Sequence, residues 1–183
     1  MYLYGNRLSG EIPDLSPLQN LQVLYLNENN LTGAADNVLY SFQSVIVIFV
    51  PCTVGPIHPS IGALERLEEL YLYDNRLSGQ LIDFTRLKSL REVWLQGNQL
   101  SGGIPSSITA ATALTKLYLY KNQLSGGIPE ELCSLTNLVE LNLHENQISG
   151  SIPDCIGQLI HLTELNLSHN RLSGMGLKQL FSL

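Results

Sequence analysis

The chain has 183 residues, of which 44% are hydrophobic and 14% charged, a balance that suits one ordered domain and excludes a disordered polar chain. Its formal net charge is -6 and no cluster of Lys or Arg stands out, so no nucleic-acid partner is expected, because phosphate backbones require concentrated positive charge. The longest apolar run, residues 45–50, is far shorter than the roughly 20 residues of a membrane-spanning helix. We therefore expect no direct membrane insertion by this segment.

Asparagine recurs at a regular spacing along the chain. The steps are 23 or 24 residues, with one double step of 46 whose midpoint is Cys52. The series consists of Asn6, Asn29, Asn75, Asn98, Asn122, Asn146 and Asn170. A fixed period of this length is typical of a solenoid built from stacked repeats. The spacing predicts a single domain over residues 1–183 with about eight repeats, the first truncated and the third, around Cys52, degenerate.

The clearest repeat, residues 114–129, reads Leu-x-x-Leu-x-Leu-x-x-Asn-x-Leu-Ser-Gly-Gly-Ile-Pro. Leu117 and Leu119 alternate with strand periodicity, so both should face the core while Tyr118 faces outward. The amide of Asn122 has two donors and an acceptor, and can satisfy backbone groups in its own and the adjacent repeat. The pattern predicts one short parallel strand per repeat and a structural ladder of Asn29, Asn75, Asn98, Asn122, Asn146 and Asn170.

Beyond the asparagine, several repeats continue as Leu-Ser-Gly-x-Ile-Pro or Ile-Ser-Gly-x-Ile-Pro. This segment occurs at residues 8–13, 100–105, 124–129 and 148–153. Together with the leucine pattern it resembles the plant-specific leucine-rich-repeat subfamily, which includes receptor-like kinase ectodomains, receptor-like proteins and polygalacturonase-inhibiting proteins. The resemblance implies an α/β repeat solenoid, a right-handed curved superhelix with a parallel β-sheet on the concave side. It also implies an extra short strand near the Ser-Gly-x-Ile-Pro segment and short helices or 3-10 turns on the convex side.

Three repeats depart from this pattern. Residues 31–35 and 79–83 lack the Ile-Pro pair, and in residues 54–59 the motif is shifted. The cysteine-bearing end caps usual in the family are not recognisable either. We interpret the chain as a truncated member, or as a divergent member from outside plants.

Aromatic residues dominate two neighbouring columns of outward-facing strand positions. Tyr and Trp are enriched in binding hot spots and paratopes. Alternatively, the rings serve only to stabilise the sheet through cross-strand pairs, each contributing about 0.2 to 1 kcal/mol. We favour binding, because the rings cluster on the face that the resembled family uses for ligands. The expected ligand-binding residues of the concave face are Tyr25, Tyr71, Tyr73, Trp94, Tyr118, Tyr120, Asn142 and His144.

An acidic column interrupted by Lys116 flanks these aromatic residues. Such a rim would favour basic partners, whereas the alternative is a solvated face that keeps the solenoid soluble. The rim residues are Glu69, Asp74, Glu92, Glu140 and Glu164.

The third repeat carries apolar residues at outward positions, namely Ile46, Ile48 and Val50. They form either an exposed docking patch or a degenerate repeat whose strand is covered by residues 34–44. We favour the covered strand.

The three cysteines are too few for a dense disulfide framework. Cys133 and Cys155 lie on the convex side of adjacent repeats, close enough in principle to pair. Because a two-residue offset can spoil disulfide geometry, unpaired thiols are the favoured expectation. Two glycosylation sequons, at Asn30 and Asn166, matter only if the chain is secreted.

No catalytic motif of a known class is present, so the chain is predicted to be neither an enzyme nor a cofactor-binding protein. His144, Glu145 and His169 should lie near one another and could bind a metal or move protons. We instead favour a solvated rim, because no third metal ligand is evident.

The main hypothesis is a recognition module that binds a protein or peptide, as part of a cell-surface receptor or receptor-like protein in signalling or defence. The alternatives are an inhibitor of a secreted wall-degrading enzyme, the repeat segment of a receptor kinase with its catalytic domain outside this chain, and an intracellular scaffold. The first residues lack a signal-peptide pattern. The expected location is therefore the cell surface for a fragment of a longer precursor, or the cytoplasm for a chain complete as given.

Overall fold

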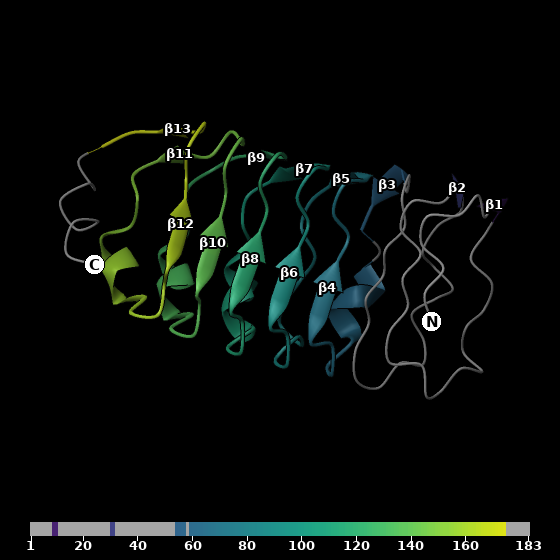
Figure 1. Cartoon of the computed structure of the whole chain (residues 1–183), viewed down its shortest axis with the longest axis horizontal. Coiled ribbons are helices and arrows are strands. Elements are labelled where there is room, and N and C mark those ends of the chain that lie inside the picture. The colour runs from purple at the N-terminus through teal and green to yellow at the C-terminus, as the bar shows by residue number, and fades with distance from the viewer. Residues whose placement is uncertain (1–8, 11–29, 32–53, 58, 175–183) are drawn as a thin grey trace.

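The computed structural model describes residues 9–10, 30–31, 54–57 and 59–174. Within this part of the chain, short strands lie side by side in chain order, with helical turns behind them (Figure 1). The strand expected for the third repeat, including Ile46, Ile48 and Val50, lies outside the described residues. The expected repeat solenoid is confirmed.

The main sheet takes one strand from each described repeat. Its five parallel strands are ordered β12-β10-β8-β6-β4. They are β4 (Glu69–Tyr71), β6 (Glu92–Trp94), β8 (Lys116–Tyr118), β10 (Glu140–Asn142) and β12 (Glu164–Asn166). In β4 to β10 only the central residue is fully buried, because successive side chains of a strand point to opposite faces. One face of the sheet therefore belongs to the core, and the other carries the residues at positions one and three of every strand.

A second row of short parallel strands runs along one edge of the solenoid (Figure 1). One sheet joins β3 (Val54–Pro56), β5 (Arg76–Gly79), β7 (Gln99–Gly102) and β9 (Gln123–Leu124). Two further pairs join β11 (Ser149–Gly150) to β13 (Arg171–Leu172), and β1 (Ser9–Gly10) to β2 (Asn30–Leu31). The extra strand implied by the Ser-Gly-x-Ile-Pro segment is thus present in the described repeats.

In four of the described repeats, the side away from the main sheet is formed by a single 3-10 turn, whereas residues 81–90, between β5 and β6, form irregular turns. The 3-10 turns are η2 (Pro59–Ala63), η3 (Ser106–Ala110), η4 (Glu130–Ser134) and η5 (Asp154–Gln158). A proline precedes η3, η4 and η5 in an extended or near-extended conformation. Proline suits this boundary because its φ is fixed and no backbone N–H is needed there. Among the described residues, no helix has the length and apolarity needed to cross a membrane.

A continuous apolar core fills the space between the sheet and the 3-10 turns. The repeat at residues 114–135 contributes its leucines and the isoleucine of the Ile-Pro pair, all at most 6% exposed. They are Leu114, Leu117, Leu119, Leu124, Ile128, Leu132 and Leu135. Because each repeat is only one layer thick, its apolar side chains are buried by stacking against the neighbouring repeats.

Asparagine side chains connect successive repeats inside the turn that follows each main strand. The Asn122 carbonyl accepts a hydrogen bond from the Leu100 N–H at 3.0 Å, and its amide donates to the carbonyls of Leu95 at 2.9 Å and Leu119 at 3.1 Å. The same pattern recurs at Asn98, Asn146 and Asn170. Each amide thereby satisfies backbone groups of the preceding repeat as well as its own.

Asn75 lies at the edge of the described main-sheet repeats. Its amide donates to the carbonyls of Leu72 and Tyr73, but its buried carbonyl oxygen has no hydrogen-bond partner within the described part of the chain. Asn6, Asn29 and Cys52 lie outside the described residues.

The expectation of unpaired thiols was wrong, because Cys133 and Cys155 form a disulfide. The two cysteines are 22 residues apart and their Cα atoms are separated by 5.8 Å, well inside the range that a disulfide spans. Cys133 lies late in η4 and Cys155 lies early in η5. The compact 3-10 turns stack closely enough that the two-residue offset within the repeat is absorbed along the turn.

Replacing Asn122 with alanine should lower the free energy of unfolding by about 3 kcal/mol, because several hydrogen bonds are lost and buried backbone groups are left unsatisfied. Asn137→Ala is the matched control, since this exposed amide makes a hydrogen bond to the Thr112 carbonyl at 2.9 Å, and should cost less than about 1 kcal/mol. Urea unfolding followed by circular dichroism measures both. Equal losses in the two variants would contradict a special role for the ladder.

Reducing the disulfide should lower the free energy of unfolding by about 3 kcal/mol, as expected for a loop of this length. The measurement is urea unfolding of the wild type with and without reductant. The Cys133→Ala/Cys155→Ala variant should match the reduced wild type and should not respond to reductant. A wild type that is equally stable under both conditions would argue against the cross-link.

Candidate functional site

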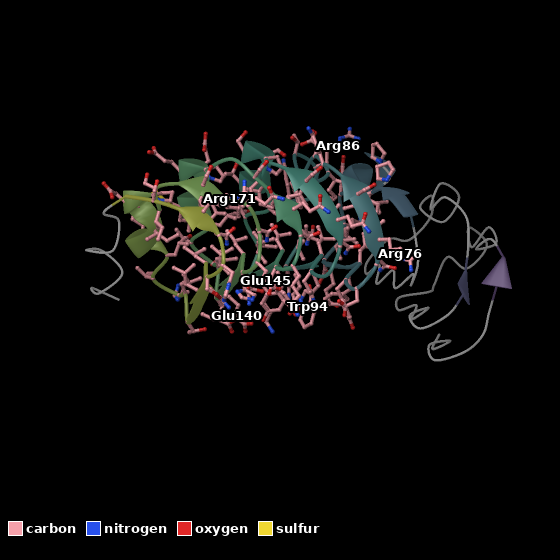
Figure 2. The ribbon with its side chains drawn as sticks, turned by 90° about the horizontal axis from the view of Figure 1, so that it is seen from above. Arg76, Arg86, Trp94, Glu140, Glu145 and Arg171 are labelled. Carbon is pink, nitrogen blue, oxygen red and sulfur yellow. A yellow bond between two sulfur atoms is a disulfide. The ribbon has the colours of Figure 1, made fainter. Side chains whose placement is uncertain are left out.

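The register of the main sheet aligns its outward-facing residues into columns. Tyr71 is paired with Trp94 and Trp94 with Tyr118, and the column continues through Asn142 to Asn166. A parallel column joins Glu69, Glu92, Lys116, Glu140 and Glu164. In Figure 2, Trp94 and Glu140 lie along one side of the ribbon and Arg86 lies along the opposite side. The columns therefore form one continuous surface.

Five aromatic rings on this surface make a continuous row, which we call the aromatic row: Tyr71, Tyr73, Trp94, Tyr118 and Tyr120. The Trp94 ring lies at its centre, with centroids 5.2 Å from Tyr71, 6.0 Å from Tyr73 and 4.9 Å from Tyr118. The Tyr118 and Tyr120 centroids are 6.3 Å apart. Most contacts are edge-to-face, the arrangement that aromatic quadrupoles favour. All five side chains are half-buried. The row therefore exposes part of each ring to solvent, while packing against neighbouring residues restricts the movement of the rings.

Two carboxylates hold the polar atoms of the row. Glu92 Oε2 accepts hydrogen bonds from the Tyr71 hydroxyl at 2.7 Å and from Trp94 Nε1 at 3.1 Å. Glu140 Oε2 accepts a hydrogen bond from the Tyr118 hydroxyl. Hydrogen bonds to a charged acceptor are stronger than neutral ones, so these contacts restrict the rotation of three rings.

Lys116 lies between the same two carboxylates. Its Nζ atom is 3.8 Å from Glu92 Oε1 and 3.7 Å from Glu140 Oε1. Residues in one column lie next to one another on adjacent parallel strands. The Lys116 cation between the two glutamates therefore removes the like-charge repulsion that adjacent carboxylates would cause. Glu69 and Glu164 continue the column at either end, and Asn142 donates a long 3.5 Å hydrogen bond to Glu164.

Burial and its carboxylate neighbours raise the pKa of the Tyr71 hydroxyl far above its usual value. Burial is the largest cause, followed by the hydrogen bond to Glu92 and the charges of Glu92 and Glu69. A phenolate at this position would lose water and face negative charge. Tyr71 therefore stays a neutral hydrogen-bond donor wherever the protein is folded under ordinary conditions.

A turn residue with positive φ follows each main strand. The residues at this position are Asp74, Gly97, Lys121, Glu145 and His169, with φ between 51° and 69°. At Gly97 a Cβ atom would lie 2.1 Å from the Asp74 Oδ1 atom, so a side chain there would require the Asp74 carboxylate to move. Asp74 therefore lies against the backbone at the border of the surface.

The end of the surface nearest β12 is polar rather than aromatic. His144 Nδ1 is 2.7 Å from Ser168 Oγ, and its ring lies edge-to-face with His169 at a centroid distance of 4.9 Å. His144 Nε2 is 3.8 Å from Glu145 Oε1. His144, Glu145 and His169 do lie together, but the described residues contain no group of three or more His, Cys, Asp or Glu side chains that could hold a metal ion.

Gln96 was not singled out from the sequence. It follows Trp94 by two residues and is 5% exposed, and its Oε1 atom has no hydrogen-bond partner among the described residues. Its column neighbours are Tyr73 and Tyr120. The sequence signal that could have drawn attention to Gln96 is a polar residue between two tyrosines in one column. Its burial, however, depends on how the aromatic rings pack.

Family models for the leucine-rich repeat match residues 20–42, 66–86, 89–110 and 112–172, which is more than half of the 183 residues. The chain belongs to the leucine-rich-repeat family. A curated relative, a probable LRR receptor-like serine/threonine-protein kinase of Arabidopsis thaliana, is 47% identical over 51 residues, covering 28% of this chain and 6% of the relative.

Two solved leucine-rich-repeat structures are similar over nearly the whole chain. The ectodomain of the plant membrane receptor kinase GASSHO1/SCHENGEN3 from Arabidopsis thaliana, in complex with CASPARIAN STRIP INTEGRITY FACTOR 2, gives a TM-score of 0.84 at 36% identity, covering 93% of this chain and 21% of that one. The Arabidopsis receptor kinase HAESA, in complex with the peptide hormone IDA and the co-receptor SERK1, gives 0.82 at 32% identity, covering 95% and 30%. The chain thus spans less than a third of these relatives.

The structure brings together most of the residues expected at the leucine-rich-repeat concave face. Tyr71, Tyr73, Trp94, Tyr118 and Tyr120 are adjacent, with Asn142 and His144 following toward β12. Tyr25 lies outside the described residues. Glu92 and Glu140 lie between the rings and Lys116, while Asp74 lies at the opposite border of the face.

Replacing Tyr71 with phenylalanine should flatten the loss of stability at alkaline pH. The unfolded chain ionises this tyrosine at about pH 10, whereas the folded chain keeps it protonated, so its contribution to stability is full below that pH and declines above it. Urea unfolding from about pH 9 to about pH 11 should therefore show a steeper decline in the wild type than in Tyr71→Phe. Tyr120→Phe is the matched control. If the stability of Tyr71→Phe declined with pH as steeply as that of the wild type, the raised pKa of Tyr71 would be contradicted.

Proposed function

We propose that the chain is the ligand-binding part of a cell-surface receptor or receptor-like protein, and that it holds a peptide or protein segment on the aromatic row. The observation that carries the proposal is the continuous set of five rings on one face, three of them fixed by Glu92 and Glu140. Rigid amphipathic rings give a large contact area and lose little conformational entropy on binding.

The shape of the surface supports an extended ligand. The rings follow one another from β4 to β8, and Asn142 and His144 continue the line toward β12. These polar side chains offer hydrogen-bonding groups to a ligand backbone beyond the aromatic contacts. The solved relatives GASSHO1/SCHENGEN3, bound to CASPARIAN STRIP INTEGRITY FACTOR 2, and HAESA, bound to the peptide hormone IDA, are consistent with such a ligand.

The disulfide supports an extracellular location. Disulfides persist in oxidising compartments and are rare in the cytosol, and Cys133 of η4 is paired with Cys155 of η5. The similar solved structures include an ectodomain of a membrane receptor kinase. We therefore propose the cell surface rather than the cytoplasm, with any catalytic domain outside this chain.

The proposal is tested by selecting peptides from a random displayed library against the purified full chain. Trp94→Ala and Tyr118→Ala should each weaken binding of the selected peptides by about tenfold or more, as expected when a central hot-spot ring is removed. Ile160→Ala is the matched control, because Ile160 is 75% exposed and lies just after η5, away from the aromatic row. Binding is measured by surface plasmon resonance and folding by thermal melting.

Unchanged peptide affinity in Trp94→Ala and Tyr118→Ala, together with reduced stability, would contradict the proposal. The rings would then serve only to stabilise the sheet.

A further inference from the structure

The acidic column of the main sheet contains one cation at its centre. Glu69, Glu92, Glu140 and Glu164 surround Lys116 along the column. The Lys116 side chain keeps 33% of its surface exposed, and the two carboxylates that face it keep 23% each. The ammonium group of Lys116 therefore lies at the protein surface beside the aromatic row, where a bound ligand would also lie.

In Glu92 and in Glu140, only one of the two carboxylate oxygens accepts hydrogen bonds from the aromatic rings. Their Oε2 atoms accept the hydrogen bonds of Tyr71, Trp94 and Tyr118. Their Oε1 atoms face Lys116 at 3.8 Å and 3.7 Å, and both distances exceed that of a hydrogen bond. Two partly buried carboxylate oxygens are thus paired by charge with an ammonium group that bonds neither of them directly.

The neighbouring column adds a further acceptor without a donor. Gln96 is 5% exposed and its Oε1 atom has no partner among the described residues. An unsatisfied buried amide oxygen costs free energy. The Gln96 oxygen is itself buried, so the acceptors that the surface presents here are the carboxylates of Glu92 and Glu140, which suit a ligand group that carries several N–H donors.

We propose that Glu92, Glu140 and the rings of Trp94 and Tyr118 form a seat for an arginine side chain of the bound peptide, and that Lys116 occupies this seat in the free protein. This inference rests on the peptide-binding function proposed above. A guanidinium group is planar, carries five N–H donors and stacks on aromatic rings, so it matches two carboxylates beside a Trp better than an ammonium group does. Lys116 has a long flexible stem, and an incoming arginine displaces it toward solvent.

A purely structural role for Lys116 leads to a different expectation. If the lysine only neutralises Glu92 and Glu140, its removal lowers stability and creates no binding site. If it occupies a seat for arginine, its removal exposes two unpaired carboxylates and strengthens arginine binding. The two roles therefore differ in the sign of the effect on binding.

The experiment uses the full chain and the peptide acetyl-Gly-Arg-Gly-Arg-Gly-amide as the probe. The same peptide with citrulline in place of arginine is the matched neutral probe. Trp94 is the only tryptophan in the sequence, so intrinsic fluorescence reports binding at the seat directly. Lys88→Met is the control variant, because it removes the same charge from an exposed lysine outside the column.

Lys116→Met should bind the arginine peptide about fivefold more tightly than the wild type, the factor that a competing exposed ion pair is worth. Lys88→Met should show no such gain, and the citrulline peptide should gain nothing in either variant. Adding Glu92→Gln to Lys116→Met should remove the gain. Equal affinity of Lys116→Met and the wild type, or an equal gain for citrulline, would overturn the inference.

Should Lys116→Met fail to melt like the wild type, Glu92→Gln alone decides the question. This change keeps an acceptor for Tyr71 and Trp94 but removes the charge. Weaker binding of the arginine peptide than in the wild type supports the seat, and unchanged binding overturns it.

The outcome is separable from that of the proposed function. Library peptides that bind through Trp94 and Tyr118 while Lys116→Met gains no affinity for arginine would leave the peptide-binding function standing and reject the seat. Library peptides whose binding ignores Trp94 and Tyr118 would reject the function itself.

Discussion

The hydrogen bonds of the asparagine side chains set the geometry on which the rest of the structure depends. A single amide, such as that of Asn122, satisfies the backbone of its own turn and that of the preceding repeat. Because these groups are buried, leaving them unpaired is costly, and the repeats of Asn98, Asn122, Asn146 and Asn170 stack with the asparagine in the same place. The step of 23 or 24 residues between asparagines is thereby converted into a constant register between strands.

A constant register is what turns isolated residues into a binding surface. Tyr71, Trp94 and Tyr118 come from three repeats and touch only because their strands are paired in register. The same register places Glu92 and Glu140 where they accept the polar hydrogens of these rings. The scaffold thus pre-organises the face, and a ligand that binds there does not have to order the side chains it meets.

The parts of this protein that follow a strict period were accessible from the sequence, whereas contacts between side chains were not. The alternation around Leu117 and the spacing of Asn122 predicted the strands, the core and the columns, because those features recur along the chain. The pairing of Cys133 with Cys155 was missed, since it depends on how closely two 3-10 turns stack. The burial of Gln96 could not be predicted from the sequence either, because it arises from the packing of side chains around that position.

The repeat, the parallel strands and the set of residues that share the aromatic face all follow from the order of residues, because backbone periodicity and burial of leucine require them. The folded structure was needed to show which charged side chains pair with one another on that face. The column order predicted that Lys116 lies between Glu92 and Glu140, but not that its ammonium group pairs with both carboxylates. Electrostatic pairing depends on distances between side chains of different repeats, and those distances are set by stacking rather than by the order of residues along the chain.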